Sequence, residues 1–324
     1  MPTDLHELRS LIAPQLEQVV RRFDAELDSR YSFVRDLCGR VVELRGKMLR
    51  PTLTLLAGRA CGDLTDQHVV VATVVEMIHV ATLVHDDVLD EADLRRRAPT
   101  INRHAGNETA VLLGDYLISH AYHLCSSLDS VRAARRVAAA TNRVCEGELM
   151  QVHHRGDWGL SEEGYLEIVR LKTAELTRAA CELGAVLAGA AEPNIAALAA
   201  YGEDVGIAFQ IVDDMLDITA AATDTGKSVG RDALLAKPTL PVIHFLAHAD
   251  RAGRDQLTRL AAESTPQARG ELRRILIDLG SLDYARATAT RHAESAVSRL
   301  SVLPESEARH ALAHAATMII DRGA

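Results

Sequence analysis

Aromatic residues are scarce in this 324-residue chain, at 3% of the sequence. Apolar residues nevertheless make up 48%, which is ample for a large core. Alanine and leucine recur throughout, and both favour helices, whereas strands are enriched in aromatic and β-branched residues. The composition therefore predicts a helical protein.

The sequence also has no excess of basic residues, no closely spaced cysteine pair and no long hydrophobic run. The 36 basic and 45 acidic residues give a net charge of -9, so we expect no nucleic-acid partner. The five cysteines form no C-x-x-C pair, which favours reduced thiols over zinc ligands or disulfides. The N-terminus is polar and no uninterrupted apolar run reaches membrane-spanning length. We therefore expect no transmembrane segment and a cytoplasmic location.

Prolines are few, and the intervals between them are long enough for uninterrupted helices. Apolar residues recur at helical spacing over residues 69–89, 133–152 and 173–191. A turn is expected at 154–161 and a functional loop at 219–241. No linker or repeat of fixed period divides the chain, so we expect an all-α, single-domain bundle of roughly ten or more helices over residues 1–324.

A first cluster of carboxylates lies at the end of the first of these predicted helices. Its three aspartates, Asp86, Asp87 and Asp90, are three and four residues apart and share one helical face. Such crowding is costly without a cation. Hard carboxylate oxygens suit Mg²⁺, which bridges carboxylates to substrate phosphates.

A second cluster, Asp213, Asp214 and Asp217, repeats the spacing after an apolar stretch, where unpaired acids would be costly to bury. Gln210 lies one turn earlier and is expected to point the same way. One such cluster alone is more often an exposed helix end. Two copies in apolar settings favour a site that holds metal ions around a diphosphate leaving group.

Several cations are candidates for phosphate contacts. Arg95 and Arg96 follow the first cluster, and guanidinium groups match phosphate oxygens. Lys47 and Arg50 lie just before Pro51, a residue that favours a helix start, so both cations and a helix N-terminus could meet one anion. Each of these residues taken alone could be a solvated surface cation.

Five more polar residues belong to the same set of candidates. Lys172 stands beside Thr173, and Lys227 and Lys237 lie within the predicted loop. His79 lies two helical turns before the first aspartate cluster on the same face, which favours a ligand contact over the usual role of a buried core histidine.

Taken in order from about Gly46 to Pro241, these residues resemble the trans-type polyprenyl diphosphate synthase family. The stretch from Glu76 to Arg96 resembles the first aspartate-rich region of that family, and the stretch from Phe209 to Asp217 resembles the second. The resemblance implies the isoprenoid synthase fold around a central elongation cavity, and a homodimer. Glycines of the family are replaced at Arg45, Arg97 and Ala236, which changes the backbone freedom of the loops there.

The resemblance also implies a role for each matching residue. It implies Mg²⁺ ligands, with about three ions per active site when substrate is bound: Asp86, Asp87, Asp90, Asp213 and Asp217. Contacts to an allylic diphosphate are implied for Arg95, Lys172, Thr173, Gln210, Lys227 and Lys237. Contacts to isopentenyl diphosphate are implied for Lys47, Arg50, His79 and Arg96. The catalytic set comprises Asp86, Asp87, Asp90, Asp213, Asp214, Lys172 and Lys227.

The family reaction begins with ionisation of the allylic diphosphate. The isopentenyl double bond then attacks the cation, and a proton is lost to the departing diphosphate. In this family the residues just before the first cluster line the pocket for the growing chain, here Ala81 and Thr82, with Met77 and Ile78 deeper on the same wall. By this resemblance the small side chains of Ala81 and Thr82 leave the pocket open and imply a long product, of about six to ten isoprene units. Whether Met77 and Ile78 form its floor is left open.

Other functions explain fewer of these residues. A short-chain synthase would make products of about fifteen or twenty carbons from the same motifs. A metal phosphohydrolase could use His79, His85 and Asp86, but it leaves the second cluster and the arginine pair unexplained. A terpene cyclase needs no second diphosphate site. A non-catalytic subunit of a heteromeric synthase should have lost aspartates, and both clusters are intact.

Overall fold

The computed structural model describes residues 10–44, 46–95, 98–219, 237–263 and 265–321. The chain divides into two compact units. Unit 1 comprises Met1–Thr141, Leu176–Gly202 and Val297–Ala315, and unit 2 comprises Asn142–Glu175, Glu203–Ala296 and Ala316–Ala324. The prediction of one domain over residues 1–324 stays a prediction.

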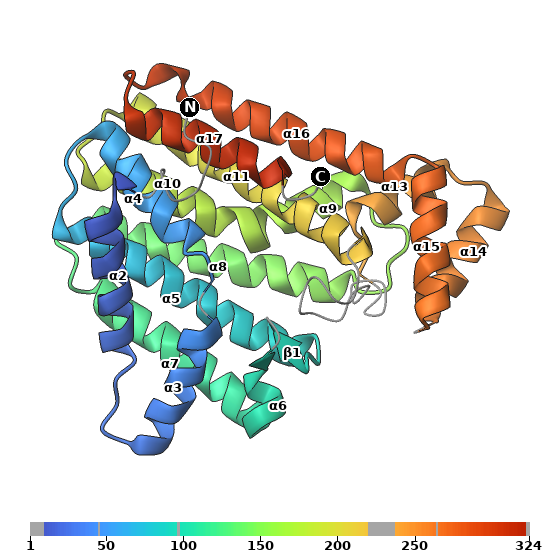
Figure 1. Cartoon of the computed structure of the whole chain (residues 1–324), viewed down its shortest axis with the longest axis horizontal. Coiled ribbons are helices and arrows are strands. Elements are labelled where there is room, and N and C mark those ends of the chain that lie inside the picture. The colour runs from blue at the N-terminus through green and yellow to red at the C-terminus, as the bar shows by residue number, and fades with distance from the viewer. Residues whose placement is uncertain (1–9, 45, 96–97, 220–236, 264, 322–324) are drawn as a thin grey trace. The chain divides into compact units, whose positions relative to one another are not determined.

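The elements follow one another mostly as helices (Figure 1). The first part of the chain forms α2 (Ala13–Glu26), α3 (Ser32–Leu44), α4 (Leu49–Cys61), α5 (Asp66–Leu89), β1 (Leu94–Arg95), β2 (Ala98–Pro99), α6 (Ile101–Ala105) and α7 (Asn107–Cys125). The rest forms α8 (Val131–His153), α9 (Glu162–Val169), the π-helical turn η1 (Arg170–Ala174), α10 (Glu175–Leu187), α11 (Glu192–Thr219), α13 (Leu240–His248), α14 (Arg251–Ala262), α15 (Pro266–Asp278), α16 (Ser281–Arg299), the 3-10 turn η2 (Leu300–Val302) and α17 (Glu307–Asp321).

Within unit 1, α5 is the central helix. It packs against α2, α4 and α7 (Figure 1). Most of its side chains are buried. Its start is set by a capping box in which the Thr65 side chain and the His68 side chain each bond the backbone of the other. Near the other end, Val84 and Asp87 are still buried, so the first aspartate cluster begins inside the core.

A buried histidine joins three helices of unit 1. His68 of α5 is fully buried, and its Nε2 donates to the carbonyl of Gly184 in α10 at 3.1 Å. Its Nδ1 accepts from the backbone N–H of Thr65 at 3.0 Å. Gly58 of α4 makes room for the ring, because a Cβ there would lie 2.6 Å from the imidazole Cδ2. Burial lowers the pKa of His68, so the ring is held neutral between these partners.

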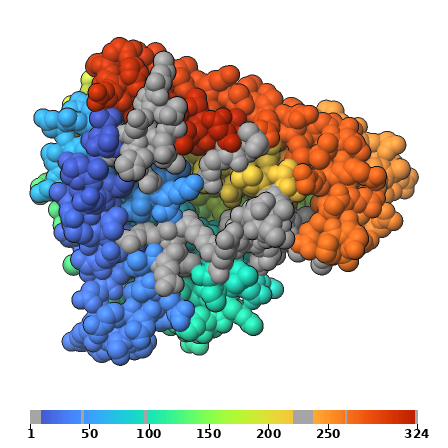
Figure 2. Space-filling view, in the orientation of Figure 1, coloured from blue at the N-terminus to red at the C-terminus, as the bar shows by residue number. Residues whose placement is uncertain are grey.

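In unit 2, α13 packs against α9, α14 and α15. Its start at Leu240 follows Pro238 and includes Pro241 in the first turn, where proline costs no helical hydrogen bond. Figure 2 shows surface formed by α14 and α15 in this unit, and by α2 and α3 in unit 1.

The prediction of an all-α fold with about ten or more helices is confirmed. Of the residues that the structure describes, only β1 and β2 form strands, and they pair in a short antiparallel hairpin. The stretches 69–89 and 133–152 lie within α5 and α8, and the predicted turn at 154–161 joins α8 to α9. The stretch 173–191 differs, since it begins inside η1 and α10 ends at Leu187. Most of the predicted loop, residues 220–236, lies outside the described residues.

Two of the described helices are long and apolar enough to cross a membrane by length and composition, α5 and α11. Their most apolar windows are 78% and 61% buried. Buried core helices pass the same test of length and composition. The burial of these two windows is that of helices packed inside a fold.

The neutral state of His68 predicts a pH-dependent stability. In the unfolded chain this side chain takes up a proton below about pH 6.5, and in the folded chain its lowered pKa prevents that. The free energy of unfolding should therefore fall as the pH drops below about 6.5, by up to about 1.4 kcal/mol per pH unit. Urea denaturation between pH 5 and pH 7.5 measures the slope. His68→Gln should flatten it, whereas His123→Gln, at an exposed position, should leave it unchanged. Equal slopes in all three proteins would contradict the prediction.

Candidate active site

The first aspartate cluster lies at the C-terminal end of α5. Asp87 is buried, at 1% exposure, whereas Asp86 and Asp90 are half-buried. The chain then turns sharply, because Glu91 adopts a left-handed backbone with φ of 51° and the N–H of Ala92 donates to the Asp87 carbonyl at 2.7 Å. This turn leads into the β1–β2 hairpin, so residues that follow the helix return to it.

Arg95 of β1 is the residue that returns. Its Nε lies 2.9 and 3.0 Å from the two carboxylate oxygens of Asp87, and a second guanidinium nitrogen lies 2.9 Å from Oδ1. Burial raises the pKa of Asp87, Arg95 opposes that rise, and the charges of Asp86 and Asp90 add to it. Asp87 thus holds Arg95 in place, and Arg95 in turn favours the charged form of this buried carboxylate.

A buried cation lies elsewhere in unit 1. Arg50, in the first turn of α4, is 9% exposed, and its Nε is buried without a hydrogen-bond partner among the described residues. Burial lowers the pKa of Arg50, and Glu76 of α5 opposes that shift. An unsatisfied buried N–H is costly, so this group is suited to an anionic ligand. Lys47, which precedes the helix, is exposed, and His79 of α5 is half-buried.

In unit 2 the π-helical turn η1 carries Lys172 and Thr173. Two glycines let neighbouring helices approach it. A Cβ on Gly206 of α11 would lie 2.5 Å from the Cα of Ala174, and one on Gly147 of α8 would clash with the backbone of the turn. Turns of this kind are rare and occur frequently at functional sites. The turn sets the direction in which Lys172 and Thr173 point.

A chain of hydrogen bonds runs from this turn to the second aspartate cluster. Thr173 Oγ1 donates to Gln210 Oε1 at 2.9 Å, and Gln210 Nε2 donates to Asp214 Oδ1 at 2.7 Å. The other oxygen of Asp214 accepts from the Tyr165 hydroxyl at 2.6 Å. Asp214 is 5% exposed, so both oxygens of a buried carboxylate are satisfied by neutral donors. The predicted direction of Gln210 is confirmed by its bond to Asp214.

The other predicted residues of unit 2 lie nearer the surface. Asp213 and Asp217 are half-buried on α11. Lys172 pairs with Glu148 of α8, and both side chains are 19% exposed. Lys237 is half-buried just before α13. Asp214 is thus the most buried carboxylate of this cluster, and its two neighbours are more accessible.

The predicted chain-length residues all lie on α5. Ala81, Met77 and Ile78 have no exposed surface, and Thr82 is half-buried. The Thr82 hydroxyl donates to the His79 carbonyl at 2.8 Å, within the same helix. Their assignment to a product pocket stays a prediction. Arg96 and Lys227 lie outside the described residues, as do the loop positions Arg45, Arg97 and Ala236.

Three residues at these sites were not predicted as contributors. Tyr165 bonds Asp214, Glu148 pairs with Lys172, and Glu76 lies near Arg50. Tyr165 stands two helical turns before Lys172, a spacing that could have marked it. Nothing in the sequence marks Glu148, since its pairing depends on how α8 packs against η1.

The histidine that a phosphohydrolase would need is engaged in packing. His85 Nε2 donates to the Val111 carbonyl of α7 at 3.0 Å, and Gly114 leaves room for the ring. Within the described ranges, no three His, Cys, Asp or Glu side chains are gathered closely enough to hold a metal ion by themselves. Any metal at these carboxylates must complete its coordination with water or with a ligand, which is the habit of Mg²⁺.

Comparison with known proteins covers nearly the whole chain. The family model described as polyprenyl synthetase matches residues 32–279. An octaprenyl diphosphate synthase of Haemophilus influenzae is 38% identical, over 98% of this chain and 97% of the relative. An all-trans-nonaprenyl-diphosphate synthase (geranyl-diphosphate specific) of Rhodobacter capsulatus is 38% identical, over 91% of each chain.

A solved structure is similar in fold as well. The polyprenyl synthase of Caulobacter crescentus, crystallised with calcium and isoprenyl diphosphate, has a TM-score of 0.95 and 34% sequence identity. The alignment covers 99% of this chain and 98% of that one.

The bond from Tyr165 to Asp214 yields a prediction about stability. Tyr165→Phe removes one of the two donors to a buried carboxylate and should lower the free energy of unfolding by about 1–3 kcal/mol. Urea denaturation measures the loss. Tyr122→Phe, at an exposed position, is the matched control and should change little. The loss should shrink in an Asp214→Asn background, and an equal loss in both backgrounds would refute the pairing.

Proposed function

Because this chain belongs to the polyprenyl synthetase family, we propose that it joins isopentenyl diphosphate to allylic diphosphates and makes a long-chain all-trans polyprenyl diphosphate. The observation that carries the proposal is near full-length similarity to octaprenyl and nonaprenyl diphosphate synthases. The chain is accordingly a trans-prenyltransferase, and its intact aspartate clusters support catalysis by this chain itself.

Isopentenyl diphosphate would be held by cations of unit 1. The buried Arg50 has an unsatisfied Nε and a nearby acid, Glu76, that favours its charged state. A diphosphate oxygen that accepted from this nitrogen would remove the cost of the unsatisfied donor. Lys47, His79 and Arg96 are proposed to contact the same substrate, which fits their positions along the chain near α4, α5 and the hairpin.

The allylic diphosphate would meet the residues of η1 and the hairpin. Lys172 and Thr173 are presented by the π-helical turn, and Gln210 is oriented by its two hydrogen bonds. Arg95, held by both oxygens of Asp87, offers a guanidinium whose orientation is set before substrate arrives. We propose Lys227 and Lys237 as further contacts to this substrate.

The donor sets of the two clusters fit Mg²⁺. Accessible hard oxygens are presented by Asp86 and Asp90 in the first cluster and by Asp213 and Asp217 in the second. Asp87 is proposed as a metal ligand too, and it also pairs with Arg95. We propose that the two clusters hold about three Mg²⁺ ions when substrate is bound. Bound metal would neutralise the diphosphate as it leaves. Because no three carboxylate side chains gather for a metal among the residues that the structure describes, metal binding should depend on the substrate phosphates.

The chain's own residues would then orient the two substrates, and none of them would act as a nucleophile. No protein nucleophile is required, because the π electrons of isopentenyl diphosphate form the new C–C bond as the allylic C–O bond breaks. A proton then leaves the product cation for the released diphosphate, which restores a double bond. Donors such as Lys172 and Arg95 would stabilise the negative charge that develops on the leaving group. An apolar surrounding would keep water from the cation.

We further propose that the protein is a soluble, cytoplasmic homodimer. Burial of the apolar windows of α5 and α11 supports solubility, and the excess of acidic residues gives no general attraction to anionic lipid. Sedimentation of the purified chain measures the oligomeric state.

Elongation by the purified protein is the direct test of the function. Labelled isopentenyl diphosphate, a geranyl or farnesyl starter and Mg²⁺ should give products of about six to ten isoprene units, sized after the diphosphate is removed. EDTA should abolish the reaction, and Asp213→Asn should lower the rate by about a hundredfold or more, since a leaving-group ligand is lost. Asp115→Asn, an exposed carboxylate outside both clusters, is the control. Phosphate release without elongation would instead indicate a phosphohydrolase.

The chain-length assignment has its own test. Ala81→Phe places a large ring on the wall proposed to receive the growing chain and should shift the products by two or more isoprene units toward short chains. Ala81→Val should give an intermediate shift. Because Ala81 is fully buried, the larger residue should also cost about 1–3 kcal/mol of stability, so folding is checked by circular dichroism. A folded Ala81→Phe enzyme with unchanged products would exclude Ala81 from the pocket.

A further inference from the structure

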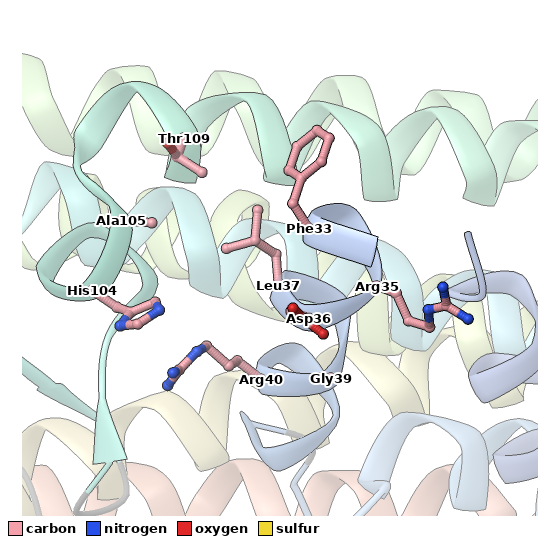
Figure 3. Close-up of a pocket in the computed structure, with 9 residues that line it drawn as sticks. All are labelled: Phe33, Arg35, Asp36, Leu37, Gly39, Arg40, His104, Ala105 and Thr109. Carbon is pink, nitrogen blue, oxygen red and sulfur yellow. The ribbon is translucent and has the colours of Figure 1, made fainter. Parts of the chain in front are cut away.

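A cavity of about 800 Å³ lies in unit 1 (Figure 3). Its walls are α3 on one side and α6 with the first turn of α7 on the other. That volume is within the usual range for small-molecule sites. None of the residues assigned above to either substrate or to the metal lines it.

The lining divides into a cationic part and an apolar part. In Figure 3 the Arg40 guanidinium of α3 and the His104 ring of α6 lie near each other on one side of the cavity. Phe33 and Leu37 of α3 extend on the other side, toward α7. Phe33 is 67% exposed, which is unusual for a phenylalanine and leaves its ring open to a ligand.

Arg40 and His104 have no anionic partner among the described residues. Among the described residues neither Arg40 nor His104 takes part in a side-chain hydrogen bond or ion pair, although acidic residues outnumber basic ones in the chain. Arg132, by contrast, pairs with Glu192 at 2.6 Å. One acid, Asp36, and a second arginine, Arg35, also line the cavity, so the two arginines outnumber the acid. An unpaired guanidinium beside an imidazole forms a local site suited to an anion.

We propose that this cavity binds a prenyl diphosphate at a second site, distinct from the catalytic one. Arg40 and His104 would donate to the diphosphate, and the first isoprene units would lie on Phe33 and Leu37. This inference rests on the proposed function, which supplies such amphiphiles as substrates and products.

The position of the cavity connects it to the candidate active site within unit 1. Its α6 wall begins at Thr100, whose hydroxyl donates to the carbonyl of Ala92, just beyond the first aspartate cluster. Its α3 wall leads along the chain toward Lys47 and Arg50. A ligand that bridges α3 and α6 therefore contacts both segments that carry unit 1 site residues. Occupancy should change elongation, as expected of a site that senses product.

The test uses a reporter placed in the cavity. Phe33→Trp introduces a fluorophore in the cavity. The parent protein has a single tryptophan, Trp158, and serves as the control for fluorescence changes that arise outside the cavity. Farnesyl diphosphate is titrated in EDTA without isopentenyl diphosphate, so no turnover occurs. We expect a saturable fluorescence change in the Phe33→Trp protein alone. Adding Arg40→Gln should weaken the apparent affinity about tenfold, and adding Asp36→Asn, which removes the one acid, should strengthen it about twofold.

Two ligands separate the contributions of head and tail. Inorganic diphosphate should compete with farnesyl diphosphate, but at higher concentration, whereas farnesol, which lacks the anion, should compete weakly. Leu37→Trp serves as a second reporter if Phe33→Trp does not fold. In the parent background, Arg40→Gln should leave the initial elongation rate unchanged and reduce inhibition by added long-chain product.

Several results would overturn the proposal. One is a fluorescence signal that does not saturate, and another is equal affinity for farnesyl diphosphate with and without Arg40→Gln. A third is a change of sedimenting mass in the Arg40→Gln protein, because that change would assign the cavity to an interface between chains. The elongation assay is independent of this titration. Elongation without reporter binding would refute the second site alone, and reporter binding without elongation would refute the proposed function alone.

Discussion

The structure depends on keeping carboxylates charged at the edge of an apolar core. The helix α5 is buried along most of its length and then ends in three aspartates, one of which, Asp87, is itself buried. Burial and like charge both favour the protonated form of Asp87, and Arg95 opposes them with contacts to both oxygens. The left-handed turn at Glu91 and the hairpin that follows are the backbone features that bring Arg95 back to this carboxylate.

The second unit keeps its buried carboxylate in place by a different arrangement. The described bonds to Asp214 come from the neutral donors Tyr165 and Gln210, and Gln210 is held in turn by Thr173. Removing one member leaves a buried polar atom without a partner, so the network is stiff. Because Thr173 lies on the π-helical turn beside Lys172, the same network relates the acidic helix α11 to the cationic turn.

Much of the fold and part of the candidate site followed from sequence periodicity. Helical spacing placed α5 and α8 within a few residues of their bounds, and one-turn spacing correctly aligned Gln210 with Asp214. The partners Tyr165 and Glu148 were missed because their contacts join separate elements. The hairpin at β1 and β2 was also missed, since two-residue strands carry no periodic signal.

The sequence by itself determined the helical class, the two aspartate clusters and the family, because composition, short-range spacing and motif order are all read along the chain. Only the tertiary structure decided that Arg95 bonds Asp87, that Arg50 is buried near Glu76, and that Arg40 and His104 line one side of a cavity together. These pairings join residues from different elements. Their existence depends on turns and helix packing, and a single sequence does not encode them at any fixed spacing.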